Sequence, residues 1–159
     1  MNVLSTQYEF ARDSRKRLLK YCEKISPQDF LKENENFGGR SIQFLLIHVA
    51  NVYEYYLKNF IEGKGFPSND NYLIDKIYLV EKHYEKVNEI VSVFVEKYKD
   101  DFEIVISGKI PNYNKILNTT PLQLFTHTAT HEFHHKGQIL TMGRLLGYKP
   151  IDTDIIHFT

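Results

Sequence analysis

Apolar residues recur at spacings of three and four along most of the chain, which is the pattern of amphipathic helices. Four such segments stand out, at about residues 3–25, 41–59, 71–99 and 121–146. The third is the most regular, and its apolar positions alternate between the two spacings: Ile77, Val80, Tyr84, Val87, Val91, Phe94 and Tyr98. The pattern predicts an all-α fold, a four-helix bundle formed as one domain over residues 1–159.

Glycine and proline mark the ends of these helices. Pro27 should end the first helix, because proline disfavours helix in the residue before it. Residues 63–70 are rich in turn formers and predict the connector between the second and third helices. Thr120 is a suitable N-cap for the last helix, and Gly147 a suitable C-cap. Between the third and fourth helices, the β-branched content of 102–106 predicts a small hairpin or irregular excursion.

Two histidines on the last helix are the main candidates for chemistry. His131 and His135 are four residues apart, so on a helix they project from one face about 40° from each other. Leu124 and Met142 share that face, which places the pair within the apolar stripe. Each buried imidazole needs partners for two ring nitrogens, and a shared metal ion satisfies one nitrogen on each ring. The spacing therefore predicts a metal site inside the bundle.

The same residues spell H-E-x-x-H, the zincin peptidase signature, in which Glu132 would be the general base. The remainder of that pattern is missing, since Gln138 stands where a glycine is required and Thr141 where a third histidine could follow. No glutamate follows His135. Little before residue 100 is predicted to form a strand that could hold a peptide substrate. The sequence thus argues against a peptidase.

A third ligand is expected from upstream, and His48 is the candidate. Its helical neighbours within about 60° are apolar or aromatic: Phe44, Leu45, Val52 and Tyr55. With the pair on the last helix, His48 would complete a three-histidine site that keeps one position open. Such an open site is the catalytic arrangement, whereas a closed set of four ligands is structural.

The other histidines are weaker candidates. His127 lies one turn before His131, so it is a candidate second-shell donor or substitute ligand. His134 points away from the pair by about 60° to 100°, which predicts a surface or interface position. His83 and His157 have no partner at ligand spacing, and a structural role is expected for both.

Composition excludes several classes of partner. The chain has 20 Lys and Arg against 20 Asp and Glu, so no large basic surface for nucleic acid or anionic membrane is expected. One local cluster is basic but spreads around the first helix, which predicts a solvated surface: Arg12, Arg15, Lys16, Arg17 and Lys20. The single Cys22 excludes an internal disulfide and favours a reducing, cytoplasmic location, where it would be a buried small hydrophobe. No signal peptide or membrane-spanning run is expected.

The histidines and their surroundings resemble a known family. His48 within residues 39–51, the H-x-x-x-H pair, the following residues 136–138 and the closing Gly147 are similar to the DinB-like (DinB/YfiT) superfamily of four-helix-bundle metalloproteins. Its members more often have Arg where Lys136 stands, which keeps the charge. The resemblance implies a divalent metal site made by His48, His131 and His135, and it implies a homodimer.

The resemblance also implies three alternative functions. Some relatives use the metal with a low-molecular-weight thiol such as bacillithiol or mycothiol, which makes a metal-dependent thiol S-transferase with a small-molecule substrate the first hypothesis. The second is a metal-dependent hydrolase that activates water, and the third is a non-catalytic metal-binding stress-response protein. Zinc or nickel is the expected ion, since imidazole accepts both. Glu132 and Tyr55 are candidates to assist proton transfer.

Overall fold

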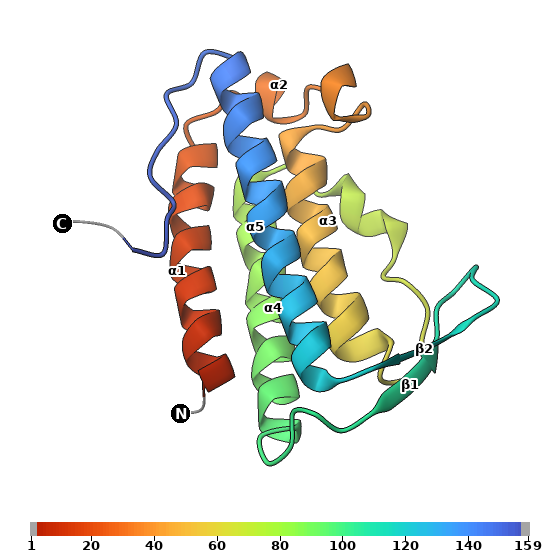
Figure 1. Ribbon diagram of the computed structural model, residues 1–159. Helices are drawn as coiled ribbons and strands as arrows, with labels where there is room; N and C mark the ends of the chain where they lie inside the picture. The colour runs from red at the N-terminus through yellow and green to blue at the C-terminus, as the bar shows by residue number, and fades with distance from the viewer. Residues whose placement is uncertain (1–2, 157–159) are drawn as a thin grey trace.

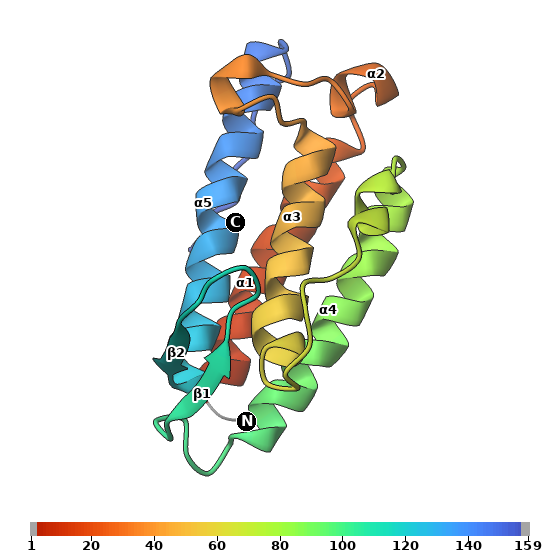
Figure 2. The ribbon, with the colours of Figure 1, turned by 90° about the vertical axis from the view of Figure 1, so that its right-hand side faces the viewer.

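Four long helices form the body of the molecule in the computed structural model, which describes residues 3–156 (Figures 1 and 2). They are α1 (Val3–Cys22), α3 (Ile42–Glu54), α4 (Ile77–Lys97) and α5 (Pro121–Leu145). Short helical pieces lie between them: α2 (Pro27–Phe30), η1 (Glu35–Phe37), η2 (Tyr55–Asn59) and η3 (Asn69–Leu73). The prediction of an all-α four-helix bundle is confirmed. No helix within residues 3–156 is long and apolar enough to span a membrane.

The first helix contains a charged residue that the sequence prediction placed wrongly. Its buried positions follow the expected spacing: Leu4, Tyr8, Ala11, Leu18 and Cys22. Arg15 falls within that stripe, four residues after Ala11 and three before Leu18, and it is 2% exposed. The prediction of a solvated basic surface is therefore wrong for Arg15, because helix phase turns this side chain into the bundle.

Two of the predicted helices differ in their details. The second continues beyond α3 as the π-helical turn η2, in which the Phe60 amide donates to the Tyr55 carbonyl at 2.7 Å. The third does not begin at residue 71, because Ile74 and Lys76 have extended backbone conformations and α4 starts at Ile77. The segment between η2 and α4 is therefore a folded loop that runs along α3 (Figure 2).

A small hairpin follows α4, as the sequence predicted. Strand β1 (Ile106–Lys109) pairs antiparallel with β2 (Ile116–Thr119). The hairpin begins later than expected, because the Phe102 carbonyl accepts from the Leu122 amide at 2.9 Å, at the start of α5. A Cβ atom at Gly108 would lie 2.6 Å from the Phe60 ring, so β1 packs directly on the end of η2.

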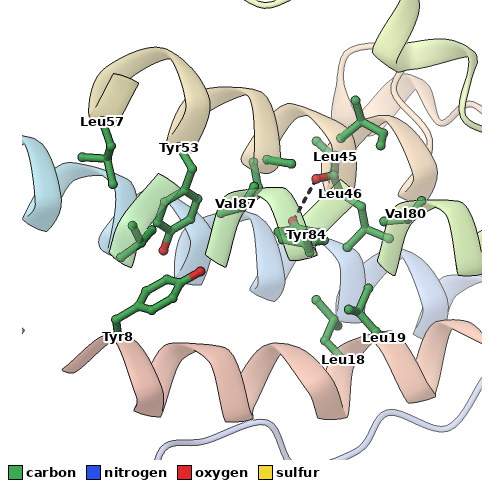
Figure 3. Close-up of a cluster of buried hydrophobic side chains, with 14 of the residues drawn as sticks. Tyr8, Leu18, Leu19, Leu45, Leu46, Tyr53, Leu57, Val80, Tyr84 and Val87 are labelled. Carbon is green, nitrogen blue, oxygen red and sulfur yellow. Dashed lines mark hydrogen bonds between the residues drawn. The ribbon is translucent and has the colours of Figure 1, made fainter. Parts of the chain in front are cut away.

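The core lies where α1, α3 and α4 face one another (Figure 3). Leu18 of α1, Leu46 of α3 and Val80 of α4 are at most 2% exposed. The Tyr84 hydroxyl donates to the Leu46 carbonyl at 2.9 Å, which satisfies a polar atom within this apolar region. Removing the Leu18 side chain from a core of this kind typically costs about 2–5 kcal/mol. The packed core fixes the position and rotation of α3, which carries His48.

Candidate metal centre

Helices α3 and α5 bring together the three histidines singled out in the sequence. His48 lies in the middle of α3, and His131 and His135 lie one turn apart on α5. One ring nitrogen from each residue lies within 4.8 Å of the other two, so the three side chains are positioned to hold a metal ion. The start of α5 is set by Thr120, whose hydroxyl accepts from the Gln123 amide at 3.1 Å, as the sequence predicted.

A hydrogen bond sets the tautomer of one of the three rings. His135 Nδ1 lies 2.6 Å from Gln138 Oε1, and because an amide oxygen only accepts, this nitrogen carries the proton. Nε2 of His135 then has a free lone pair, and it lies 3.2 Å from Nε2 of His131. Two nitrogens bound to one tetrahedral zinc ion lie about 3.4 Å apart. The separation of these atoms therefore fits a shared ion.

The three imidazoles are neutral at physiological pH. Burial, together with the charges of His135 and Arg40, lowers the pKa of His48 to about 4. Burial and the neighbouring histidines lower the pKa of His131 to about 3, and burial lowers the pKa of His135. Since a histidine binds metal in its neutral form, these shifts keep the ligand lone pairs available. His131 Nδ1 is buried without a hydrogen-bond partner among the described residues.

A cavity of about 480 Å³ adjoins His48 and His131. Its other walls come from α3 and η2, from the loop before α4, and from α5. Among the residues that line it, none is acidic and none is Lys or Arg: His48, Asn51, Val52, Tyr55, Tyr56, Phe66, Pro67, Asn69, Tyr72, His127 and His131. A larger cavity of about 590 Å³ lies between α1 and α4 and contains none of the three histidines. We therefore regard the cavity beside the histidines, which we call the site cavity, as the place for a ligand.

Glu132 does not line the site cavity, although it follows His131 directly. Its Oε1 accepts from Arg15 Nε at 2.7 Å, and its Oε2 accepts from Arg15 Nη2 at 2.8 Å and from the Tyr53 hydroxyl at 2.8 Å. Burial alone would raise the pKa of Glu132, but the Arg15 charge and hydrogen bonds outweigh burial and lower it. The carboxylate is therefore fully engaged as an anion. It is not placed for the proton transfer considered from the sequence.

Arg15 completes this ion pair inside a cluster of aromatic rings. Its guanidinium carbon lies 5.4, 5.4 and 4.5 Å from the ring centroids of Tyr8, Tyr53 and Tyr84. Nη1 also donates to the Tyr8 hydroxyl at 3.2 Å. The position of Arg15 in the apolar stripe of α1 was the sequence signal that could have revealed this buried charge.

A second buried cation, Lys136, lies one turn along α5 from Glu132. Its ammonium group donates to the Ser14 hydroxyl, which in turn donates to the Thr153 carbonyl. This chain of hydrogen bonds joins α5, α1 and the segment after α5. The resemblance pointed to position 136, but its burial and its partners are visible only in the structure.

The remaining histidines of α5 lie outside the cluster of three. His127 is exposed and lines the site cavity, with its ring 4.7 Å from that of Tyr56 and 5.6 Å from that of His131. It is not part of the group whose nitrogens converge on one point. His134 is exposed on the surface of the helix.

The other residues weighed in the sequence have structural surroundings. His83 is 6% exposed on α4, away from the cluster. Cys22 is 1% exposed in the core, and burial raises the pKa of its thiol to about 12, as suits a buried hydrophobe. His157 lies outside the described residues.

A family model described as the DinB family matches residues 1–159. The chain belongs to the DinB family. Membership agrees with the resemblance drawn from His48 and from the H-x-x-x-H pair, and with the four-helix architecture. The family match itself assigns no activity.

Several known proteins are similar to this DinB family member. The protein YizA of Bacillus subtilis (strain 168), described as uncharacterized, is 24% identical over 156 residues, which cover 96% of this chain and 93% of YizA. A DinB-like protein from Bacillus cereus ATCC 10987 superposes with a TM-score of 0.65 at 12% identity, covering 92% of this chain and 94% of the other. The four-helix bundle protein TT2238 gives 0.62 at 17% identity, covering 87% and 99%. These structures show the shared fold.

Proposed function

We propose that His48, His131 and His135 bind a divalent transition metal, zinc or nickel, and that the protein is a metal-dependent transferase acting with a low-molecular-weight thiol of the bacillithiol type. The observation that carries the proposal is a cluster of three imidazoles, two of which, His48 and His131, line a cavity without acidic lining residues. Three protein ligands leave a coordination position for a ligand that enters from the site cavity.

The lining of the site cavity favours a thiol over water as the nucleophile. A divalent ion at an open histidine site lowers the pKa of a bound thiol or water. A free thiol has a pKa of about 8.5, whereas bulk water has a pKa of about 15.7. A thiol therefore loses its proton with far less help from a protein base. The residues that line the cavity offer no carboxylate base, because Glu132 is held by Arg15.

Arg40 supplies a positive charge on the His48 side of the site. Its guanidinium carbon lies 5.4 Å from the centroid of the Phe44 ring, which stacks on His48 at 6.2 Å. Arg40 is exposed, and no ion pair with an acidic residue is found for it within residues 3–156. A cation in this position suits the carboxylates of a bacillithiol-type thiol.

Metal-dependent hydrolysis is the second candidate, and His127 is the observation that favours it. This residue lines the site cavity, and although much of its ring is exposed, partial burial in the cavity wall lowers its pKa, so it is neutral at pH 7 and able to accept a proton from water. A metal-binding protein without catalytic activity is the third candidate. The three functions are separated by the experiments below.

Metal content tests the site itself. We expect His48→Ala, His131→Ala and His135→Ala each to lose most of the bound metal, measured by elemental analysis of purified protein. His134→Ala is the matched control, since His134 lies on the same helix but is exposed and outside the cluster. A His48→Ala protein with full metal occupancy would show that the three-histidine site is wrong.

A thiol titration tests the reaction. We expect bacillithiol to change the visible spectrum of cobalt-substituted protein and to react with 1-chloro-2,4-dinitrobenzene, where the sulfur–carbon bond forms as chloride leaves and the thiol proton is released. An unchanged spectrum with every thiol tested, combined with turnover of an ester or amide, would favour hydrolysis. An unchanged spectrum with no turnover would favour the non-catalytic alternative.

The expected homodimer in the cytoplasm belongs to the same proposal. Support comes from the resemblance to the DinB-like superfamily and from exposed apolar side chains near the hairpin, of which Val105 is 73% and Ile116 69% exposed. Light scattering during size-exclusion chromatography should give twice the chain mass of 18.8 kDa. A monomer at micromolar concentration would contradict it.

A further inference from the structure

One tyrosine hydroxyl beside the site cavity has no partner. Tyr55 lines the cavity and is 2% exposed, and its buried hydroxyl makes no hydrogen bond within residues 3–156. By contrast, the buried Tyr53 hydroxyl donates to Glu132, and the Tyr84 hydroxyl donates to the Leu46 carbonyl. A buried unpaired hydroxyl costs stability, so it calls for an explanation such as a bound ligand.

The walls around Tyr55 are aromatic and uncharged. The Tyr55 ring lies 4.5 Å from Phe66 and 4.9 Å from Tyr56, and Tyr72 closes the cavity further along. A charged ligand would lose its water here without gaining a countercharge from any lining residue. A planar apolar ring would gain burial and ring contacts of the kind that aromatic side chains make with each other. The volume of about 480 Å³ is typical of small-molecule sites.

Local backbone structure holds these rings in place. Tyr55 begins the π-helical turn η2, and such turns often occur at functional sites. The loop after η2 is tied back by Asn59, whose side-chain amide donates to the Gly65 carbonyl at 2.9 Å. This bond fixes the loop that carries Phe66 against Tyr55. The loop and the helical turn that form this part of the cavity wall are thus joined by a hydrogen bond.

We propose that the site cavity binds an uncharged, planar aromatic molecule, and that the Tyr55 hydroxyl forms a hydrogen bond with its polar substituent. The inference rests on the proposed function in one respect, because it names the class of the electrophile that the thiol would attack. Binding of the aromatic molecule itself requires neither metal nor thiol. The electrophiles are therefore neutral arenes with a polar substituent rather than phosphorylated or other polyanionic molecules, and the carboxylates of the thiol would lie toward Arg40, which is not among the residues that line the cavity.

The test uses three probes of nearly equal shape and different charge: benzyl alcohol, benzoate and benzylammonium. Isothermal titration of the metal-free protein should show the tightest binding for benzyl alcohol. Tyr55→Phe should weaken benzyl alcohol binding about fivefold, the effect of one neutral hydrogen bond, while leaving the fold intact. Phe66→Ala should weaken all three probes by removing a wall of the cavity.

Tyr21→Phe is the matched control, because Tyr21 also has a buried hydroxyl without a partner but does not line the site cavity. It should bind benzyl alcohol as the wild type does. Equal binding by Tyr55→Phe and wild type, or tighter binding of benzoate or benzylammonium, overturns the proposal. Thiol turnover in a protein that fails this binding test would leave the proposed function standing. Normal probe binding in a protein that no thiol affects would support the aromatic ligand and contradict the proposed thiol transferase.

Discussion

The polar residues on two sides of helix α5 differ in whether their polar atoms have partners within the protein. On one side, the Nε2 atoms of His131 and His135 lie 3.2 Å apart, and Nδ1 of His131 is buried without a hydrogen-bond partner among the described residues. On the other side, Glu132 and Lys136 are each bound to named partners on α1. Each residue of the first pair is followed directly by one of the second, so about 100° of helix rotation separates the two environments.

The contrast shows which charges are structural. Glu132 stands where a zincin has its general base, yet its carboxylate is paired with Arg15 and is 2% exposed. A buried pair with all its hydrogen bonds made has no group left to react. The histidines keep free lone pairs beside a cavity, which is the arrangement that a ligand completes. On α5, the histidines with nitrogens left free for a ligand therefore mark the candidate site, and the charged residue of the motif does not.

The largest effect should come from breaking the ion pair. Glu132→Gln leaves the Arg15 guanidinium buried without a counterion, and we expect the free energy of unfolding to fall by about 3–5 kcal/mol. Urea denaturation followed by circular dichroism measures the change. Glu96→Gln is the control, because the Glu96–Lys99 pair is exposed and screened by solvent, so its loss should change stability little. Equal stability of the two variants would show that the buried pair is not structural.

A smaller change in stability should come from zinc binding to the three histidines. Free zinc at 100 times its dissociation constant should stabilise the wild type by about 2.7 kcal/mol, and His48→Ala should lose this increment. Glu132→Gln should keep the increment in full while starting from a lower stability, because its partners lie on the other side of α5. Thermal unfolding with and without zinc gives both quantities. Loss of the increment in folded Glu132→Gln would mean that the two sides are coupled.

The sequence was a good guide wherever one helix supplied the signal. Apolar periodicity predicted four helices, and the four-residue spacing of His131 and His135 predicted a shared face. His48 was found because it is centred on an inward stripe of its own helix. The same rule, applied to α1, would have placed Arg15 inside, but the spread of the basic cluster around the helix predicted a solvated surface instead.

Features that depend on distant segments could not be predicted. Arg15 and Glu132 are 117 residues apart, and nothing local links them. The site cavity needs the loop that carries Phe66 to return to α3, and that loop is positioned by the π-helical turn and by the bond from Asn59. The start of β1 depended on the pairing of Phe102 with Leu122. In each case the decisive contact is tertiary, whereas sequence periodicity reports on one element at a time.

A third effect should appear in the pH dependence of the metal-free protein. In the folded state the pKa of His48 is about 4 and that of His131 about 3, below their unfolded value of about 6.5. Between these values the unfolded chain binds more protons than the folded chain, so stability is full above about pH 6.5 and is lost as the pH falls toward 4. His131→Gln removes one such group, and its stability should fall less than that of the wild type over this range.

The control for this measurement is Thr126→Ser, which changes an exposed residue without a titratable group on the same helix and should leave the wild-type slope unchanged. Comparing each variant with wild type at every pH cancels the contribution of the carboxylates that titrate at the acidic end. Parallel curves for wild type and His131→Gln would show that this imidazole is as well solvated in the folded protein as in the unfolded chain. Burial would then not be what keeps His131 neutral, and the contrast in solvation between the two sides of α5 would be wrong.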